Sequence, residues 1–404
     1  MIPGTSSFLI PREPFLSRRT LKARATESLQ VGQSLGARHF FFWARNALFH
    51  SLQALQVPRT ARALLPAYLC KAAVEPFEAY GMRVDFYRVG RDCKADFRDL
   101  ANKVQPDTRV VLTAHYFGFP QDIIALGDFC SQRQLLLFED CAHVLQGSVA
   151  GQPLGSFGHA SVFSYRKFLP MFDGAELFLR ESSRTVSIPP RQPSRFGSAA
   201  ARHIIGQSLD SSSGFVAAFL RHAVELAKKF LPAKGQTTAD RSSPQPAVDN
   251  NSASFDPGVL DQPITSSSRW VLRHSDVAAI VALRRQNFSY LHQHLNNSPG
   301  LTPLFKSLAD GVCPWVYPLF LDGVPNAHLL IRAKGIPAVT WCDVRPSSLS
   351  RGEFADADFL YDNLVFLPIH QNMTADQLSL VADVVKKVRA EFPRLAPERI
   401  PVAS

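Results

Sequence analysis

The chain lacks the apolar runs and cysteine pairs that mark several classes of protein. No apolar run approaches the ~18 residues that a membrane-spanning helix needs, and the N-terminal residues contain no hydrophobic core like that of a signal peptide. The six cysteines form no C-x-x-C pair and show no metal-like spacing with histidine. We therefore expect a cytoplasmic protein with free thiols and no metal site.

Acidic residues are fewer than basic ones, with 34 Asp and Glu against 44 Lys and Arg, which gives a net charge of +10. An excess of this size suits an anionic partner such as a nucleotide diphosphate-sugar, a nucleic acid or a membrane surface, and it suits a plain solvated basic surface equally well. No basic run alternates with aromatic residues and no nucleic-acid-binding signature occurs, so we expect no nucleic-acid partner.

Apolar runs alternate with helix-like segments along most of the chain. At 404 residues the chain exceeds the usual size of one domain, so we predict a large and a smaller domain. The alternation predicts an α/β fold with a mostly parallel sheet covered on both faces. The predicted strands are 83–89, 109–117, 135–138 and 160–163, and the predicted helices are 40–55, 69–80, 121–133, 275–295 and 374–392, the last with Thr374 as its N-cap.

Composition sets the domain boundaries. Residues 1–34 have no periodicity and are predicted to form an N-terminal arm. We predict that the large domain comprises residues 35–264. An interdomain helix and a small C-terminal α/β domain are predicted over residues 265–404. A Ser-, Pro-, Gln- and Asn-rich insertion at about 183–262 interrupts the large domain. Within it, 214–231 has the pattern of a basic amphipathic helix, which we expect to pack on its own domain or on a second subunit rather than on a membrane.

The segment FEDCAHVLQGSVAGQPLGSFGHASVFSYRKFLPMFDGAEL carries the clearest chemical signal. An apolar run leads into Glu139 and Asp140, which places a carboxylate at the C-terminal end of a buried strand, where open α/β sheets bind ligands. A glycine-spaced connection, a second apolar run, Ser164 and then Lys167 follow. Lysine can form a Schiff base and aspartate can keep a pyridine nitrogen protonated, so together they are the protein's half of pyridoxal phosphate chemistry.

These motifs, in this order, resemble the DegT/DnrJ/EryC1/StrS family of sugar aminotransferases. The resemblance rests on E-D-x-A-H, on "FS" followed by a lysine and L-P-x-x-D-G, and on two further stretches, LLPAYLCKAAVEPFEAYGMRVDFY and NLVFLPIHQNMTADQL. It covers roughly residues 35–400. It implies the fold of the fold-type-I transferases and pyridoxal 5'-phosphate as the cofactor.

The resemblance also implies roles for individual residues. Lys167 corresponds to the lysine that binds the cofactor and then acts as general acid and base, and Asp140 to the aspartate that pairs with the pyridine nitrogen. His143 occupies a position near the ring or its phenolic oxygen. Arg166, next to the lysine, stays protonated and would at most bind phosphate or carboxylate.

The expected phosphate contacts lie at the start of a helix and at the end of a strand. Ala44, Arg45 and Asn46 match the place where relatives have a short Gly/Thr or Gly/Arg pair, at a helix N-terminus that favours an anion. A serine hydroxyl before the lysine is also expected there. The spacing leaves Ser164 and Ser161 as alternatives.

The chain departs from the family pattern in two places. Cys70 stands where an aromatic residue often stacks on the cofactor ring, so another residue must cover the ring. The stretch SSSRWVLRHSD replaces the segment whose asparagine reaches the neighbouring subunit's phosphate, with Ser268 or Arg269 as possible substitutes. His115 and Tyr116 are candidates to line the pocket, and Tyr116 fits the core equally well.

Together the motifs predict an aminotransferase. The resemblance implies a homodimer with sites at its subunit interface that moves an amino group from an amino acid, glutamate or glutamine, to a keto-sugar that is nucleotide-linked, for polysaccharide or glycosylated-metabolite synthesis. The alternative is a non-catalytic homologue with a regulatory or scaffolding role. Dehydratase relatives replace the lysine by histidine, so Lys167 argues against that activity.

Overall fold

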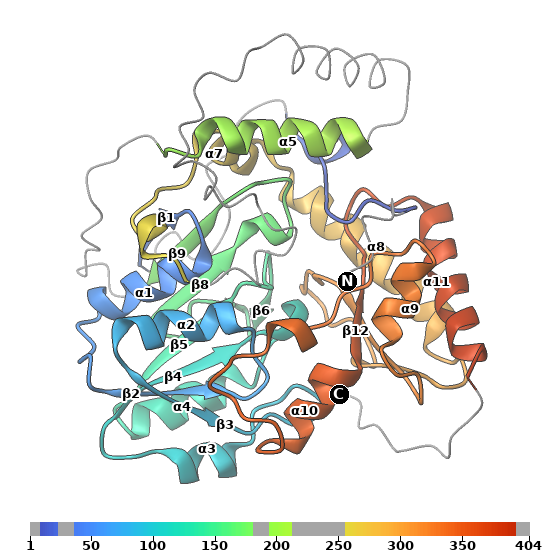
Figure 1. Cartoon of the computed structure of the whole chain (residues 1–404). Coiled ribbons are helices and arrows are strands. Elements are labelled where there is room, and N and C mark those ends of the chain that lie inside the picture. The colour runs from blue at the N-terminus through green and yellow to red at the C-terminus, as the bar shows by residue number, and fades with distance from the viewer. Residues whose placement is uncertain (1–8, 23–35, 181–193, 212–254, 393–404) are drawn as a thin grey trace, which may run out of the picture.

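The computed structural model describes residues 9–22, 36–180, 194–211 and 255–392. They form a large seven-stranded sheet with helices around it and a smaller antiparallel sheet of three strands, the two lying side by side (Figure 1). The strand order of the large sheet is β1-β9-β8-β5-β4-β2-β3. The α/β fold with a mostly parallel large sheet and a small C-terminal part is therefore confirmed.

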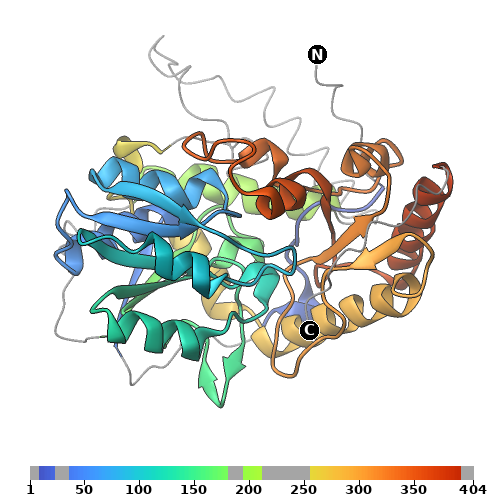
Figure 2. The same ribbon diagram turned by 90° about the horizontal axis from the view of Figure 1, so that it is seen from below.

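The large sheet is parallel from β3 to β8 and antiparallel at β9 and β1. Its strands are β1 (Ala37–Phe41), β2 (Arg62–Pro66), β3 (Arg83–Tyr87), β4 (Thr108–Ala114), β5 (Leu136–Cys141), β8 (Ala160–Ser164) and β9 (Ala175–Leu179). The intervening helices are α1 (Ala44–Ala54), α2 (Lys71–Tyr80), α3 (Phe97–Lys103) and α4 (Ile123–Gln132). Figure 2 shows helices on both faces of this sheet. Parallel strands covered in this way are apolar nearly throughout, which is why they could be predicted as uninterrupted runs.

One crossover in the sheet contains no helix. Strand β5 is joined to its parallel neighbour β8 by a short hairpin, β6 (Ser148–Val149) and β7 (Gln152–Pro153), and a glycine-containing turn. This connection separates the two strand ends that carry Asp140 and Ser164.

The second half of the chain begins with α5 (Gly197–Ser211), α7 (Ser266–His274) and the long α8 (Val277–Leu295). The antiparallel sheet of β10 (Leu301–Pro303), β11 (Tyr317–Leu321) and β12 (Leu364–Leu367) follows, with α9 (Ala327–Ala333), α10 (Ala355–Asn363) and α11 (Ala375–Ala390) around it. The last helix begins as predicted. Thr374 and Gln377 form a reciprocal capping box, in which each side chain accepts the other residue's backbone N–H.

The helix predicted over 40–55 is wrong at its start. The helix begins at Ala44, and Phe40 and Phe41 belong to β1, which pairs with β9 through Phe41 and Ala175. Trp43 is in an extended conformation and separates the two elements. Likewise, the strand predicted over 109–117 ends at Ala114, because the chain turns into a short 3-10 segment, Tyr116–Gly118.

Residues 9–22 lie outside the two sheets and contain one 3-10 turn, Arg18–Thr20. They contact α5 through Ser208 and the loop before α11 through His370. Of the predicted insertion, 255–262 lies against α1, where the Asn46 amide donates to the carbonyls of Val259 and Leu260. The amphipathic helix predicted at 214–231 lies outside the described residues. None of the described helices has the length and hydropathy needed to cross a membrane. All six cysteines are unpaired.

Candidate active site

The carboxyl ends of β2, β4, β5 and β8 meet at one pocket, on the side of the sheet where the strand order changes direction between β2 and β4. Its empty volume, including the part open to solvent, is about 630 Å³. All six residues predicted for the site line this pocket: Ala44, Arg45, Asp140, His143, Ser164 and Lys167. Further lining comes from the starts of α1 and α2, from Arg166 beside the lysine, and from two side chains that the motifs did not indicate, Trp43 and Trp341.

Asp140 lies at the C-terminal end of β5. One of its oxygens accepts a hydrogen bond of 2.9 Å from the backbone N–H of Ala142. Burial raises the pKa of Asp140, while the Ala142 N–H and the nearby Lys167 cation oppose that rise. The carboxylate therefore sits where a positively charged partner in the pocket would stabilise its ionised form.

Lys167 ends the 3-10 turn that follows β8. Its Nζ lies 4.6 Å from the centroid of the Trp315 ring, within range of a cation–π contact. His143 stacks on the same tryptophan, with its ring centroid 4.1 Å from that of Trp315. Trp315 thus links the lysine and the histidine of the predicted site, although it belongs to the second half of the chain.

The imidazole of His143 is neutral. Burial, with the Lys167 cation as a smaller cause, lowers the pKa of His143 well below its ordinary value. Its Nδ1 accepts the backbone N–H of Phe117 at 3.3 Å, so the hydrogen resides on Nε2. The ring can therefore donate one hydrogen bond from Nε2.

The opposite end of the pocket favours an anion. Helices α1 and α2 both begin there, and neither has a side chain that caps its first turn. The N–H groups and the dipole of such helix ends attract negative charge. Arg45, in the first turn of α1, adds a cationic group; burial, the larger cause, and Arg166 lower its pKa, while Glu75 at 3.8 Å partly offsets this. Ser164 adds a hydroxyl at the end of β8.

Several residues considered from the sequence do not line the pocket. Ser161 donates to the carbonyl of Gly155 at 2.6 Å and is buried, which leaves Ser164 as the serine at the pocket. Tyr116 is in the core, and its hydroxyl donates to the carbonyl of Tyr68. Asn46 is held by its bonds to residues 259–260.

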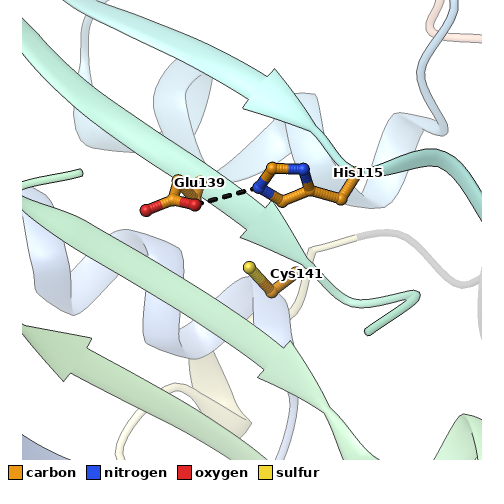
Figure 3. Close-up of side chains that lie close together, drawn as sticks. All are labelled: His115, Glu139 and Cys141. Atoms are coloured by element: carbon orange, nitrogen blue, oxygen red, sulfur yellow. Dashed lines mark hydrogen bonds and ion pairs between the residues drawn. The ribbon is translucent and has the colours of Figure 1, made fainter. Parts of the chain in front are cut away.

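His115 also faces away from the pocket and binds Glu139, the residue before Asp140 (Figure 3). Both carboxylate oxygens of Glu139 are fully used. One accepts the N–H groups of Phe157 and Gly158, at 2.8 and 2.6 Å; the other accepts His115 Nε2–H and the N–H of Gly155, each at 2.9 Å. This buried carboxylate therefore fixes the connection between β5 and β8.

Cys141 completes a group of three potential metal ligands with His115 and Glu139 (Figure 3). Burial and the neighbouring carboxylates raise the pKa of the Cys141 thiol well above its ordinary value, so it stays protonated. Because the oxygens of Glu139 already accept four hydrogen bonds, the group is structural. The tight geometry also explains Gly158, where a Cβ would lie 2.7 Å from the carbonyl oxygen of Leu137.

The two substitutes considered for the neighbouring-subunit contact differ in their surroundings. Ser268 is buried and donates to Asp173, which also accepts the backbone N–H and the hydroxyl of Thr265. Its hydroxyl is thus engaged within its own subunit. The Arg269 guanidinium lies 5.6 Å from the ring of Phe40.

Comparisons with known proteins agree with this geometry. Residues 43–183 match the model of the DegT/DnrJ/EryC1/StrS aminotransferase family. A dTDP-4-dehydro-2,3,6-trideoxy-D-glucose 4-aminotransferase from Saccharopolyspora spinosa is 33% identical over 33% of this chain and 35% of its own length. A GDP-perosamine synthase from Vibrio cholerae is 29% identical over 30% of this chain and 33% of its own. The chain thus matches about a third of the length of these relatives. The family-model match, residues 43–183, contains all six predicted site residues.

Solved structures extend the likeness to the whole fold. An aminotransferase of Helicobacter pylori involved in the biosynthesis of pseudoaminic acid, PseC, covers 96% of this chain and 100% of its own, with a TM-score of 0.64 and 14% identity. A putative sugar aminotransferase from Streptococcus pneumoniae, in its PLP form, covers 91% and 93%, with a TM-score of 0.62 and 14% identity. The recognition made from the sequence agrees with these matches: residues 43–183 match the DegT/DnrJ/EryC1/StrS aminotransferase family model, and the fold as a whole is shared with these solved aminotransferase structures.

Proposed function

We propose that this protein is a pyridoxal phosphate-dependent aminotransferase that aminates a keto-sugar. The observation that carries the proposal is the convergence of Lys167 and Asp140 on one pocket whose other end is formed by two uncapped helix starts and Arg45. An amine, a carboxylate and an anion-favouring end are the three groups that a phosphorylated pyridine aldehyde requires. The residues present therefore fit the cofactor.

When bound, pyridoxal phosphate supplies an electron sink for the carbanion that forms at the donor's α carbon. We assign Lys167 as the residue that binds it covalently and then moves the α proton at Nζ. Asp140 holds the proton on the ring nitrogen, and His143 donates from Nε2. Ala44, Arg45 and Ser164 bind the phosphate.

Besides His143, the aromatic side chains among the described lining residues are Trp43 and Trp341, and we propose that one of these two covers the ring in place of Cys70. Trp341 is 2% exposed and is packed into the wall of the pocket. Its ring centroid lies 5.3 Å from that of His143. A stacked aromatic residue contributes about 0.5–1.5 kcal/mol beyond its buried area.

The substrates are proposed from the relatives. Those from Saccharopolyspora spinosa and Vibrio cholerae are named for dTDP- and GDP-linked sugars. We propose that this chain likewise takes a nucleotide-linked keto-sugar and an amino acid, glutamate or glutamine, in the cytoplasm. We further propose that it acts as a homodimer, with the pocket beside the subunit interface.

The test is the absorbance spectrum of the purified protein with added pyridoxal phosphate, before and after glutamate. Wild type should show a band near that of a lysine-bound cofactor, and glutamate should convert it. Lys167→Ala should lack the band. Lys306→Ala, at an exposed lysine of the small domain, is the matched control and should keep it. Wild type without a lysine-dependent band would contradict the proposal and favour the non-catalytic alternative.

A further inference from the structure

A second cavity lies next to the predicted active-site pocket and shares Arg166 and Lys167 with it. Its empty volume, including the part open to solvent, is about 840 Å³. We call it the arm chamber, because residues 12–14 of the N-terminal segment form part of its wall. The rest of the wall comes from α8 and the small domain: Arg284, Trp315, Val316, Pro337, Val339, Phe366, Pro368, Ile369 and His370.

The charge of the arm chamber is positive. Arg12, Arg166, Arg284 and Lys167 line it, and among the lining residues that the structure describes Glu13 is the one acidic residue. His370 adds no charge at neutral pH, because burial lowers its pKa to about 4. The chamber thus combines three guanidinium groups with the amine that we assign to the chemistry.

Arg284 is the most informative of these residues. It is 1% exposed, and its hydrogen bonds go to uncharged oxygens: Oε1 of Gln371 and the carbonyl of Trp315, both at 2.9 Å, and the carbonyl of Lys167 at 3.5 Å. Within the described ranges, no carboxylate lies within 4 Å of its guanidinium. Burial lowers the pKa of Arg284 to about 10, so the group remains charged at neutral pH.

A buried cation without a carboxylate partner is costly, because desolvation of one ion costs several kcal/mol. The ring of Phe168, 4.8 Å from the guanidinium, and the three oxygens offset part of this cost. An anion in the chamber would offset the remainder. The buried Arg284 cation beside Lys167 therefore indicates that the chamber binds a negatively charged ligand.

The wall that carries Arg12 is anchored firmly. His370 donates from Nε2 to the carbonyl of Pro11 at 2.9 Å, and the backbone N–H of Phe15 donates to Asn372 at 3.0 Å. Gln207 donates to the carboxylate of Glu13 at 3.0 Å. Arg12 therefore belongs to a preformed wall, which lowers the entropic cost of binding a ligand there.

We propose that the arm chamber binds the carboxylate of the amino donor, with Arg12 and Arg284 as its cationic contacts. A guanidinium group pairs with a carboxylate through two parallel hydrogen bonds, which would orient the donor's amino group toward Lys167. This inference rests on the proposed aminotransferase function and names the chain's own residues for its first substrate. It gives the N-terminal arm a part in substrate binding.

Binding of glutarate, a dicarboxylate without an amino group, tests the inference by calorimetry on the protein loaded with pyridoxal phosphate. We expect Arg12→Gln to weaken glutarate binding at least tenfold. Arg19→Gln, at an exposed arginine of the same arm, is the matched control and should leave binding unchanged. Arg284→Gln should weaken binding still more; if this variant does not fold, Arg12→Gln decides alone.

Two results would overturn the inference. In the first, wild type and Arg12→Gln bind glutarate with equal affinity. In the second, Arg12→Gln weakens the binding of pyrophosphate but not that of glutarate. The second result would assign the chamber to the diphosphate of a nucleotide sugar. The Lys167-dependent absorbance band is measured on the same samples. If the band is present while glutarate binding fails, the inference alone is wrong; without the band, the proposed function is wrong.

Discussion

Replacing Glu139 by glutamine tests whether this carboxylate holds the connection between β5 and β8. Its two oxygens accept four N–H donors, from His115, Gly155, Phe157 and Gly158. Glutamine keeps one oxygen, so two of the four donors would face an amide NH2 group. A buried donor without an acceptor costs about 1–3 kcal/mol. We therefore expect Glu139→Gln to lower the free energy of unfolding by about 2–6 kcal/mol.

Urea denaturation followed by far-ultraviolet circular dichroism measures this loss as a shift of the midpoint at an unchanged slope. Glu78→Gln, at an exposed position of α2, is the matched control and should shift stability by no more than about 0.5 kcal/mol. Because Asp140 follows Glu139 directly, the variant should also bind pyridoxal phosphate more weakly than the control. A loss of stability below about 1 kcal/mol would refute the four-donor argument.

Three further predictions follow from single contacts. On the proposed assignment of Asp140 as the ionised partner of the ring nitrogen, Asp140→Asn should lower turnover by about 10²–10³ with an unchanged circular dichroism spectrum; steady-state kinetics with glutamate measures it. Thr374→Ala removes the cap of α11 and should cost about 1 kcal/mol in urea denaturation. Burial lowers the pKa of His370 from 6.5 to about 4, so the unfolded chain takes up this proton first as the pH falls. The free energy of unfolding therefore falls, by at most about 3 kcal/mol, as the pH is lowered from 6.5 to 4. His370→Asn should remove this dependence on pH, and urea denaturation at several pH values measures it.

The parts of the site that could be predicted lie on neighbouring strand ends of one sheet. Buried parallel strands are apolar throughout, so β5 and β8 stand out in the sequence, and the residues that follow them must meet at one edge. Asp140, Ser164 and Lys167 were placed by this reasoning. Helix α1 could also be predicted from its local sequence, although not the residue at which it begins. The sequence shows no break between Phe40, Phe41 and the helix that follows. Their partners in β9 are more than 130 residues further along the chain, so no local pattern assigns them to a strand.

Other parts had no local signal. Trp315 contacts Lys167 and His143 from the second half of the chain, and Trp341 reaches the pocket from the small domain. A single tryptophan in a loop is not distinguished by periodicity or spacing from one in the core. The cysteine at position 70 predicted that another residue must cover the cofactor ring, and only the fold brings Trp43 and Trp341 to the pocket as candidates.

The positions of Lys167 and of the small domain depend on each other through Arg284. Its guanidinium donates to the carbonyls of Lys167 and Trp315 and to Gln371, and the amide of Gln371 donates to the carbonyl of Phe168 at 2.7 Å. The consecutive backbone carbonyls of Lys167 and Phe168 are therefore held from α8 and from the loop before α11. Lys167, which we propose as the reactive amine, follows β8 of the large sheet, but contacts from α8 and from the loop before α11 hold its backbone in place. A buried charge that costs stability is consistent with such a role, because apolar packing could stabilise this junction without orienting the lysine.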